Sequence, residues 1–277
     1  MSGQLILVGT PIGHLSDLSP RALEALQNCD LIAAEDTRVT LKLLNHFGIR
    51  KPLISYFEHN KLMRGEELLQ KLQQGCRMVL VSDAGMPAIS DPGQDLVARC
   101  HQAGVPVTVI PGPCAAVAAL ALSGMPAGRF TFEGFLSVNK GSRREHLEAL
   151  RGETRTMIFY EAPHKLKTTL KDLYAAFGDR PVALVRELTK IYEECVNTTL
   201  AQAVRLTEEK EPRGEYVLIV GGAEPAAPEE TTLDTAVERA RTLRAGGMSA
   251  SAAARQAAAD TGWPRGEIYK RMLEERL

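Results

Sequence analysis

Short apolar runs alternate with segments of helical periodicity through the first 122 residues. Runs such as "QLILVG" are rich in branched residues and end in glycine or an acid, which is typical of buried strands. In "SPRALEALQNCD", Ser19 can cap a helix and Pro20 suits its first position. The predicted strands are 4–9, 31–36, "PLISY", "RMVLVSD" and "VPVTVIPG", and the helices that follow "SPRALEALQNCD" are 37–47, 65–74, 94–103 and 115–122.

This alternation predicts an α/β fold with a mostly parallel sheet covered on both faces. Ligands of such sheets bind at the carboxyl ends of the strands. Three loops rich in glycine and proline follow predicted strands: "GTPIG", "VSDAGMPAISDPG" and "IPGPCAA". We therefore expect them on one edge, where they would form a cleft.

The pattern changes from residue 129, at "RFTFEGFL", after a join near "LSGMPAG". Strand-like runs such as "TRTMIFYEAP" and "GEYVLIVGG" alternate with predicted helices at 142–150 and 164–177, which indicates a second α/β domain with a mixed sheet. The expected division is an N-terminal domain over 1–120, a second domain over 121–223, a linker over 224–232 and a small all-helical extension over 233–277. The extension, with a turn at 261–264, fits either a helix-turn-helix or a docking helical hairpin.

Composition narrows the function classes. The net charge is −1, so no global basic field indicates nucleic acid, although a local patch could suffice. The five cysteines form no CxxC pair and no zinc-spaced cluster, and no segment is typical of a signal peptide or a membrane span. We expect a cytoplasmic protein with no metal site.

The predicted cleft lacks the usual devices for binding phosphate. Neither G-x-G-x-x-G nor a P-loop is present, and Pro11 and Ile12 would obstruct a pyrophosphate. Small side chains, prolines and backbone amides suit an adenosine ligand without phosphates, such as S-adenosylmethionine, although composition alone does not single it out. A hydride-transfer enzyme is a weaker alternative.

Seven stretches in order carry a resemblance: "VGTPIGHLSDLSPRALEAL", "LIAAEDTRVTLKLLNHFGI", "VSDAGMPAISDPG", "VIPGPCAAVAALALSGMP", "YEAPHKLKTTLKDL", "RELTK" and "GEYVLIVGG". From residue 5 to about 222 the chain closely resembles the class III, tetrapyrrole-methylase-like methyltransferases. It is similar to the branch that methylates the ribose 2′-hydroxyl of a cytidine in the decoding region of 16S ribosomal RNA. Its tail, "GMSASAAARQAAADTGWPRGEIY", also resembles that branch.

The resemblance implies a two-domain fold that binds S-adenosylmethionine in the interdomain cleft, usually as a homodimer, with 16S rRNA or the small ribosomal subunit as partner and neither DNA nor a membrane. A sibling enzyme acting on a small molecule such as a tetrapyrrole is the main alternative. A non-catalytic nucleic-acid module acting through the tail would leave the glycine- and proline-rich loops without a role.

Methyl-donor contacts are expected from the three loops and one later strand end. Asp83 and Asp91 could bind polar groups of the donor or instead cap the local turn and helix. Two residues depart from the family pattern: Phe57 replaces an expected histidine, and Cys114 replaces the commoner serine. The candidate donor-binding residues are Pro11, Ser82, Asp83, Gly85, Met86, Ala88, Ile89, Ser90, Asp91, Cys114, Ala115 and Tyr160.

The reaction needs a base for a poorly acidic hydroxyl, or a cation that stabilises its alkoxide. The candidates are Glu35, Asp36, Glu187 and Lys190, and we expect Lys190 or Glu187 to handle the proton. The basic patch around 142–150, with Arg151 and Arg155, could bind RNA or be a solvated helix face. The candidate RNA-binding residues are Arg38, Lys140, Arg143, Arg144, His164 and Arg186.

Overall fold

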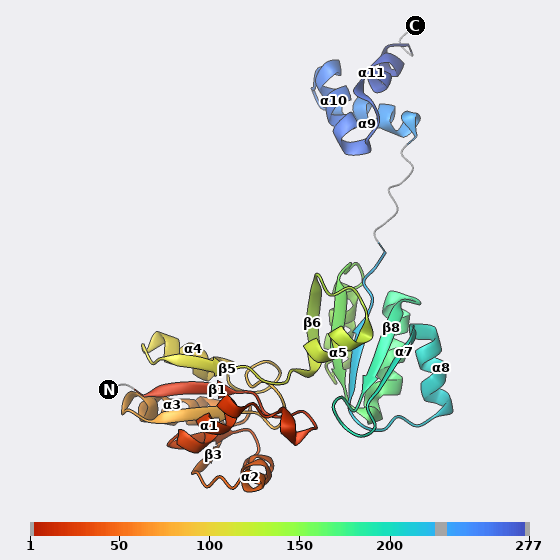
Figure 1. The fold of residues 1–277 in the computed structure, drawn as a ribbon. Helices are drawn as coiled ribbons and strands as arrows, with labels where there is room; N and C mark the ends of the chain where they lie inside the picture. The colour runs from red at the N-terminus through yellow and green to blue at the C-terminus, as the bar shows by residue number, and fades with distance from the viewer. Residues whose placement is uncertain (1–2, 225–231, 275–277) are drawn as a thin grey trace. The chain divides into compact units, whose positions relative to one another are not determined.

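The computed structural model describes residues 3–224 and 232–274, which fall into two compact units, 1–223 and 224–277. The first unit contains two five-stranded sheets and the second contains helices (Figure 1). Most of the predicted linker, residues 225–231, lies outside the described residues. No helix in the described ranges is long and apolar enough to cross a membrane.

The first sheet is entirely parallel, so the predicted α/β alternation is confirmed. Its strand order is β3-β2-β4-β1-β5, which places β1 between β4 and β5. A short 3₁₀ helix, η1 (Leu15–Asp17), precedes α1. The elements of this part are β1 (Gln4–Val8), α1 (Pro20–Asn28), β2 (Leu31–Ala34), α2 (Thr37–His46), β3 (Leu53–Ser55), α3 (Lys61–Gln73), β4 (Arg77–Val81), α4 (Gln94–Gln102) and β5 (Val107–Ile110).

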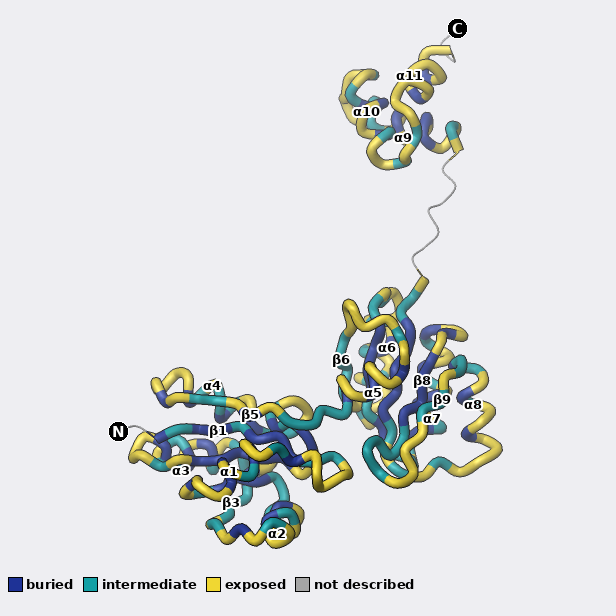
Figure 2. Tube along the Cα trace, in the orientation of Figure 1, coloured by how far each residue is buried: buried dark blue, intermediate teal, exposed yellow. Residues whose placement is uncertain are grey.

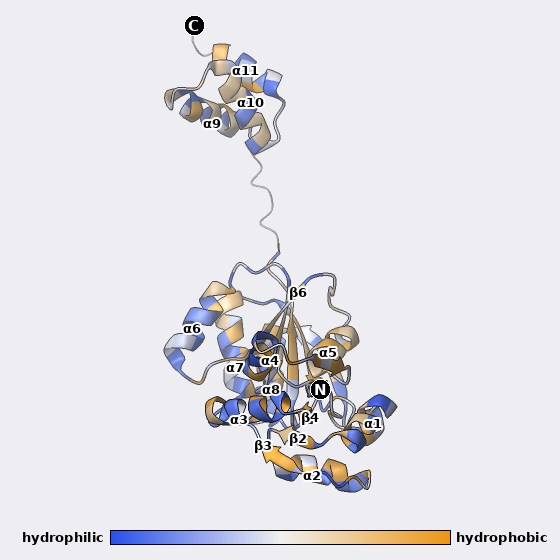
Figure 3. Ribbon diagram, turned by 90° about the vertical axis from the view of Figure 1, so that its left-hand side faces the viewer, coloured by the Kyte–Doolittle hydropathy of each residue, from blue (hydrophilic) through white to orange (hydrophobic). Residues whose placement is uncertain are grey.

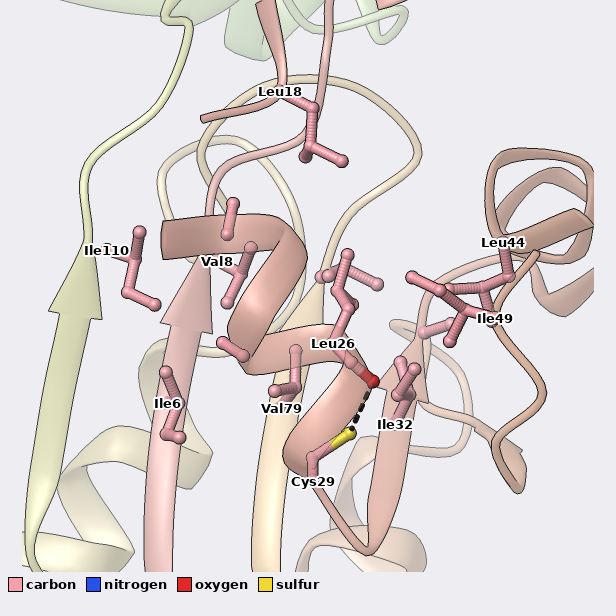
Figure 4. Close-up of a cluster of buried hydrophobic side chains, with 14 residues drawn as sticks. Ile6, Val8, Leu18, Leu26, Cys29, Ile32, Leu44, Ile49, Val79 and Ile110 are labelled. Atoms are coloured by element: carbon pink, nitrogen blue, oxygen red, sulfur yellow. Dashed lines mark hydrogen bonds between the residues drawn. The ribbon is translucent and has the colours of Figure 1, made fainter. Parts of the chain in front are cut away.

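Alternate residues of the strands supply two cores, one on each face of this sheet. Ile6 and Val8 of β1 pack in a cluster with Leu26 of α1 (Figure 4). Leu5 faces the other way, into a cluster with Leu68 of α3 and residues of α4. The inner strands β1, β2 and β4 are accordingly more buried than the edge strands β3 and β5 (Figure 2), and the loops after the strands remain available for a ligand.

The second sheet is mixed, as predicted. Its order is β6-β7-β10-β8-β9; β6 pairs with β7 in parallel and the other pairs are antiparallel. Its elements are β6 (Phe130–Phe135), α6 (Lys140–Ala149), β7 (Thr156–Glu161), α7 (Pro163–Phe177), β8 (Pro181–Arg186), β9 (Glu194–Thr199), α8 (Leu200–Glu209) and β10 (Tyr216–Val220).

Helix α5 (Ala115–Ser123) covers one face of the second sheet, because Ala116, Ala119 and Leu120 share a buried cluster with residues of β7, β8 and β10. Leucines of α6 and α7 cover the opposite face. The boundary expected between residues 120 and 121 therefore falls inside a helix that belongs to the second core. We propose instead that the division lies in the loop 111–114, before α5.

Local sequence explains where several helices begin. The Ser19 hydroxyl accepts the Ala22 amide at 3.2 Å, and Asp36 caps α2 through the Arg38 amide at 2.8 Å. Three helices start earlier than predicted: α3 begins at residue 61 rather than 65, α6 at 140 rather than 142, and α7 at 163 rather than 164. For α6 the reason is Asn139, whose side chain accepts the Gly141 and Ser142 amides.

The second unit has its own small core. Its helices are α9 (Leu233–Ala245), α10 (Ala250–Thr261) and α11 (Arg265–Glu274). Alanines of α9 and α10 pack with Ile268 and Met272 of α11. Gly262, in the left-handed region with φ +77°, ends α10 and begins the turn to α11, at the predicted position.

Candidate functional site

Three loops meet where β1, β4 and β5 end. Gly9 lies against Gly112, because a Cβ added to either glycine would come within 2.7 Å of the other's Cα. Thr10 exchanges two backbone hydrogen bonds with Gly85, of 2.9 and 3.1 Å. The three loops thus form one connected edge, as the sequence pattern predicts for neighbouring parallel strands.

A cavity of about 470 Å³ opens beside these loops, and we call it the donor cavity. Its walls come from the loops of the first sheet and from the ends of β7, β8 and β10 in the second. The volume lies within the range of small-molecule and cofactor sites. Most of the predicted donor-binding residues line it: Asp83, Gly85, Met86, Ile89, Ser90, Asp91, Cys114, Ala115 and Tyr160.

The remaining predicted donor-binding residues, Pro11, Ser82 and Ala88, do not line the cavity but lie in the same loops. Ser82 is buried, and its hydroxyl lies 3.4 Å from the carbonyl oxygens of Ala84 and Gly85. Ala88 has a left-handed φ of +64°, which is strained for a residue with a side chain. Ser82 and Ala88 therefore fix the shape of the loop after β4.

Three carboxyl groups line the donor cavity with raised pKa values. Burial is the main cause for Glu35, Asp83 and Asp91, and repulsion among the neighbouring acids adds to it. The Asp83 carboxylate accepts the Asp36 amide at 3.0 Å, so it also joins the loops after β4 and β2. Such a site favours a positively charged ligand, which would relieve this repulsion.

Tyr160, at the end of β7, forms part of the opposite wall. Its hydroxyl oxygen accepts the Ala116 amide at 3.0 Å, and its ring makes edge contacts with Phe132 and Phe135. Burial raises the pKa of Tyr160 to about 12, so the phenol stays neutral. It supplies a rigid aromatic surface rather than a charge.

Lys190 reaches the donor cavity from the loop between β8 and β9. Its Nζ donates to Glu187 Oε1 at 3.0 Å and to Glu215 Oε2 at 2.8 Å. Burial acts to lower the pKa of Lys190, but these hydrogen bonds outweigh it and raise the pKa. Lys190 is therefore held as a cation. Gly13 packs directly beneath it, since an added Cβ would lie 2.6 Å from Lys190 Cγ.

Glu187 does not line the donor cavity. Its Oε1 accepts the Glu215 amide at 3.0 Å, and this bond, together with Lys190, lowers its pKa. Asp36 is also outside the cavity lining: it caps α2 and pairs with Arg38 at 2.6 Å, and these bonds lower its pKa to about 2. Of the four predicted catalytic residues, Glu35 and Lys190 are the two that face the cavity.

Four of the predicted RNA-binding residues, Lys140, Arg143, Arg144 and His164, line a groove of about 790 Å³ between α6 and α7. Arg143 is committed to Asp172 at 2.6 Å and to the Thr169 hydroxyl at 2.9 Å. Arg151 and Arg155 do not line this groove and pair with Glu148 and Glu153. The groove therefore contains fewer of the predicted basic residues, and fewer unpaired cations, than the sequence predicts.

The other predicted contacts lie apart from that groove. Arg186, at the end of β8, pairs with Glu194 at 2.9 Å, and Arg38 is exposed. Phe57 follows β3, and its amide donates to Asn60 Oδ1 at 2.9 Å. Within residues 3–224 and 232–274, no group of histidines, cysteines and acids is placed to hold a metal ion.

Several residues of the donor cavity were not predicted. Ile12 lies in the predicted loop "GTPIG". The only feature of the sequence that marks it as a lining residue is its apolar side chain between two glycines. Ala84 also lines the cavity, from the loop after β4. The others come from the second sheet and the segments that follow its strands, and long-range strand pairing brings them to the site. Most of them lie in the quoted stretches "YEAPHKLKTTLKDL", "RELTK" and "GEYVLIVGG", which do not by themselves place a residue in a cavity. They are Phe135, Glu161, Ala162, Pro163, Val185, Leu188, Glu215, Tyr216 and Val217.

Comparison with known families gives two matches. Residues 4–204 match the model of the Tetrapyrrole (Corrin/Porphyrin) Methylases, and residues 231–276 match that of the RsmI C-terminal HTH domain. The second match favours the helix-turn-helix interpretation of the tail over the docking hairpin.

Curated relatives share much of the sequence. A protein of Synechocystis named ribosomal RNA small subunit methyltransferase I is 49% identical, covering 98% of each chain. One of the same name from Thermotoga maritima is 46% identical, and its whole length matches 80% of this chain. Among solved structures, a Thermus thermophilus uroporphyrin-III C-methyltransferase complexed with S-adenosylhomocysteine has a TM-score of 0.55 at 21% identity, over 79% of this chain and 97% of that one.

Proposed function

The chain belongs to the tetrapyrrole methylase family, in its ribosomal RNA small subunit methyltransferase branch, and from this we propose that it methylates a ribose 2′-hydroxyl of a cytidine in the decoding region of 16S rRNA. Membership of this branch makes it an S-adenosylmethionine-dependent rRNA methyltransferase. The identity of the methylated nucleotide, a cytidine, and of the methylated atom, the ribose 2′-oxygen, is the part of the proposal that experiment must test. The observation that carries the proposal is the acidic donor cavity with one fixed cation, Lys190, in its wall.

The donor cavity fits S-adenosylmethionine. Glu35, Asp83 and Asp91 suit a ligand that carries a sulfonium and an ammonium, whereas the negative charges of the three carboxylates would repel a ligand rich in phosphates. Ile12, Met86 and further apolar residues offer contacts to its uncharged parts. We expect Asp83 and Asp91 to hold the donor's polar groups. When bound, the cofactor supplies a methyl group already activated for transfer.

Two residues of the chain can handle the proton of the acceptor hydroxyl. Glu35 is a better base than an ordinary carboxylate, because burial raises its pKa toward neutrality. Lys190 stays protonated and can stabilise negative charge developing on the 2′-oxygen. Glu187 holds Lys190 in place and so acts as a positioning residue.

RNA contacts are proposed for the α6–α7 groove. Lys140 and Arg144 form no ion pair with another described residue, so they remain free for phosphates, whereas the charge of Arg143 is neutralised by Asp172. The helix-turn-helix match makes the tail a second candidate for RNA contact. An rRNA substrate also leads us to expect the chain in the bacterial cytoplasm.

A homodimer is proposed through the outer face of α5. Every residue of this helix except the last, Ser123, is apolar, and Figure 3 colours it as hydrophobic, yet Val117 and Leu122 are 54% and 45% exposed. Val109, on the neighbouring edge strand β5, is 48% exposed. A second copy of the chain would remove this apolar surface from water.

The decisive experiment maps 2′-O-methylation on 16S rRNA from cells with and without the gene, alongside calorimetry of the pure protein with S-adenosylmethionine. We expect one decoding-region cytidine to lose its 2′-O-methyl group in the deletion strain, and the protein to bind the donor. An unchanged methylation map would reject the proposed acceptor, and absence of donor binding would reject the proposed cavity.

The roles of Glu35 and Lys190 are tested by turnover with saturating donor. Glu35→Gln should lower kcat by about 10² to 10⁴-fold, as expected for loss of a general base. Lys190→Ala should lower kcat by about 10² to 10³-fold. Glu187→Ala should lower kcat by a smaller factor and change the pH dependence of kcat, because it removes one of the two hydrogen bonds that hold the Lys190 ammonium. Donor affinity is measured separately, and unchanged turnover in both Glu35→Gln and Lys190→Ala would overturn the assignment.

A further inference from the structure

A third cavity of about 540 Å³ lies on the other side of the Lys190 loop, and we call it the Tyr192 groove. It is lined by Arg186, Glu187, Tyr192, Lys210, Arg213 and Gly214 from the end of β8, the following loop and the turn between α8 and β10. Tyr192 is 72% exposed and its neighbour Ile191 is 94% exposed. An aromatic ring presented to solvent this way is a surface on which a base can stack.

The Tyr192 groove and the donor cavity share a wall. Glu187 and Gly214 line the groove, whereas the next residues in the chain, Leu188 and Glu215, line the donor cavity. The hydrogen bonds that join Lys190, Glu187 and Glu215 lie in this wall. Two residues of chain span at most about 7 Å, so Tyr192 lies close to Lys190, which faces the donor cavity.

Hydrogen bonds hold the loop that carries Tyr192 in a defined conformation. Glu187 and Thr189 have left-handed φ values of +51° and +64°. The Thr189 amide donates to Glu193 Oε2 at 2.6 Å, and the Lys190 amide donates to the Glu187 carbonyl at 2.9 Å. These bonds fix the segment before and after Tyr192, so its ring is presented at low conformational cost.

The charge of the Tyr192 groove is positive. Its five charged lining residues are three cations and two acids, and the acids, Glu187 and Glu211, pair with Lys190 and Lys167. Arg186 pairs with Glu194. Over the described part of the chain, Lys210 and Arg213 form no salt bridge, so they supply the net charge.

We propose that the Tyr192 groove binds a single-stranded nucleotide next to the methylated one, with its base stacked on Tyr192 and its phosphates held by Lys210 and Arg213. This rests on the proposed function, since the shared wall places the stacked base one step from an acceptor in the donor cavity. Single-stranded RNA is recognised through stacking and phosphate contacts of this kind. An acidic protein segment would use the two cations but would gain little from the ring.

The stacking contact is tested with Tyr192→Ala and Tyr192→Phe, using small ribosomal subunits from a strain that lacks the gene as substrate. Tyr192→Ala should raise KM for the subunit by about 5- to 150-fold, the range expected for loss of one stacked base, with kcat little changed. Tyr192→Phe keeps the ring and should behave like the wild type. Donor binding by calorimetry should be unchanged in both variants.

The cations are tested with the double variant Lys210→Ala/Arg213→Ala and a matched control, Arg77→Ala/Arg205→Ala. Arg77 begins β4, at the edge opposite the donor cavity, and Arg205 lies on α8 outside the groove. Loss of two phosphate contacts should make the slope of log K against log salt shallower by about 1.4 for single-stranded RNA. The control should leave the slope of the wild type.

These outcomes separate the groove from the proposed function. If the wild type fails to methylate the subunits, the proposed function fails. If the wild type methylates them and Tyr192→Ala keeps the same KM, the groove assignment is wrong and the function stands. A double variant that weakens binding while Tyr192→Ala does not would indicate phosphate contacts without a stacked base and would overturn the stacking proposal.

Discussion

Single residues decide the shape of the donor cavity. Gly112→Ala would place a Cβ 2.7 Å from the Cα of Gly9, where backbone rather than a flexible side chain must move. We expect a loss of about 1–3 kcal/mol in the free energy of unfolding, as for other overpacked sites, together with weaker donor binding. Denaturant unfolding and calorimetry measure the two effects.

The matched control for this change is Gly128→Ala. An added Cβ there meets no atom within 4 Å, and Gly128 does not have a positive φ. Its effect should stay within about 0.5 kcal/mol. Equal destabilisation by both substitutions would show that the close approach of the two loops is unimportant.

The acids of the donor cavity predict how donor binding depends on pH. Because the pKa of Asp83 is raised, the carboxyl takes up its proton at a higher pH than an ordinary aspartate. As the pH is lowered, donor affinity should therefore begin to fall at a higher pH than it would if the pKa of this carboxyl were not shifted. Asp83→Asn should weaken binding at neutral pH by about 10- to 100-fold and flatten the pH dependence.

Folding stability depends on pH in the opposite direction from donor binding. The folded, donor-free state holds the Asp83 proton more tightly than the unfolded chain does, so stability falls as pH rises from the usual value of 3.8 through the raised pKa. Asp17→Asn, at an exposed position outside the cavity, controls for the change in net charge. A pH profile of donor binding that is identical in Asp83→Asn and the wild type would contradict this account.

At the level of elements, α5 carries two roles. Its inner face covers the second sheet and its outer face presents Val117 and Leu122. Val117→Arg should convert the proposed dimer to a monomer without unfolding the chain, because a charge would be buried at the interface. Sedimentation velocity gives the oligomeric state. Leu206→Arg, on α8 and similarly exposed at 44%, should leave it unchanged.

The sequence predicts most elements, but not how the second sheet is assembled. Glycine- and proline-rich loops after apolar runs locate Gly9, Gly85 and Gly112, because parallel neighbours end at one edge. In contrast, β10 lies between β7 and β8, and this order is set by pairing across many residues. The contact of Lys190 with Glu215 follows from that pairing, so it leaves no trace in local sequence.

Over the whole chain, the two units have separate cores, and this predicts the effect of truncation. All clusters of the two sheets lie within residues 1–223, and the helical cluster lies within 233–272. A chain ending at residue 223 should keep the donor affinity of the full chain. Circular dichroism and calorimetry check this, and lost donor binding in a folded fragment would show that the tail supports the site.

The Thermotoga relative is consistent with that expectation, since its full length is matched by 80% of this chain. The sequence predicts where the C-terminal helical extension begins, because a Pro/Ala/Glu-rich stretch precedes it. It does not choose between a helix-turn-helix and a docking hairpin, because both place apolar residues at the same helical spacing.

The meeting of Gly9 and Gly112 also limits how this chain can diverge. Each position is closed to larger residues by the main chain of the other, so a change at one is not relieved by a compensating change at its partner. A descendant that lost either glycine would also have to shift the main chain of the facing loop.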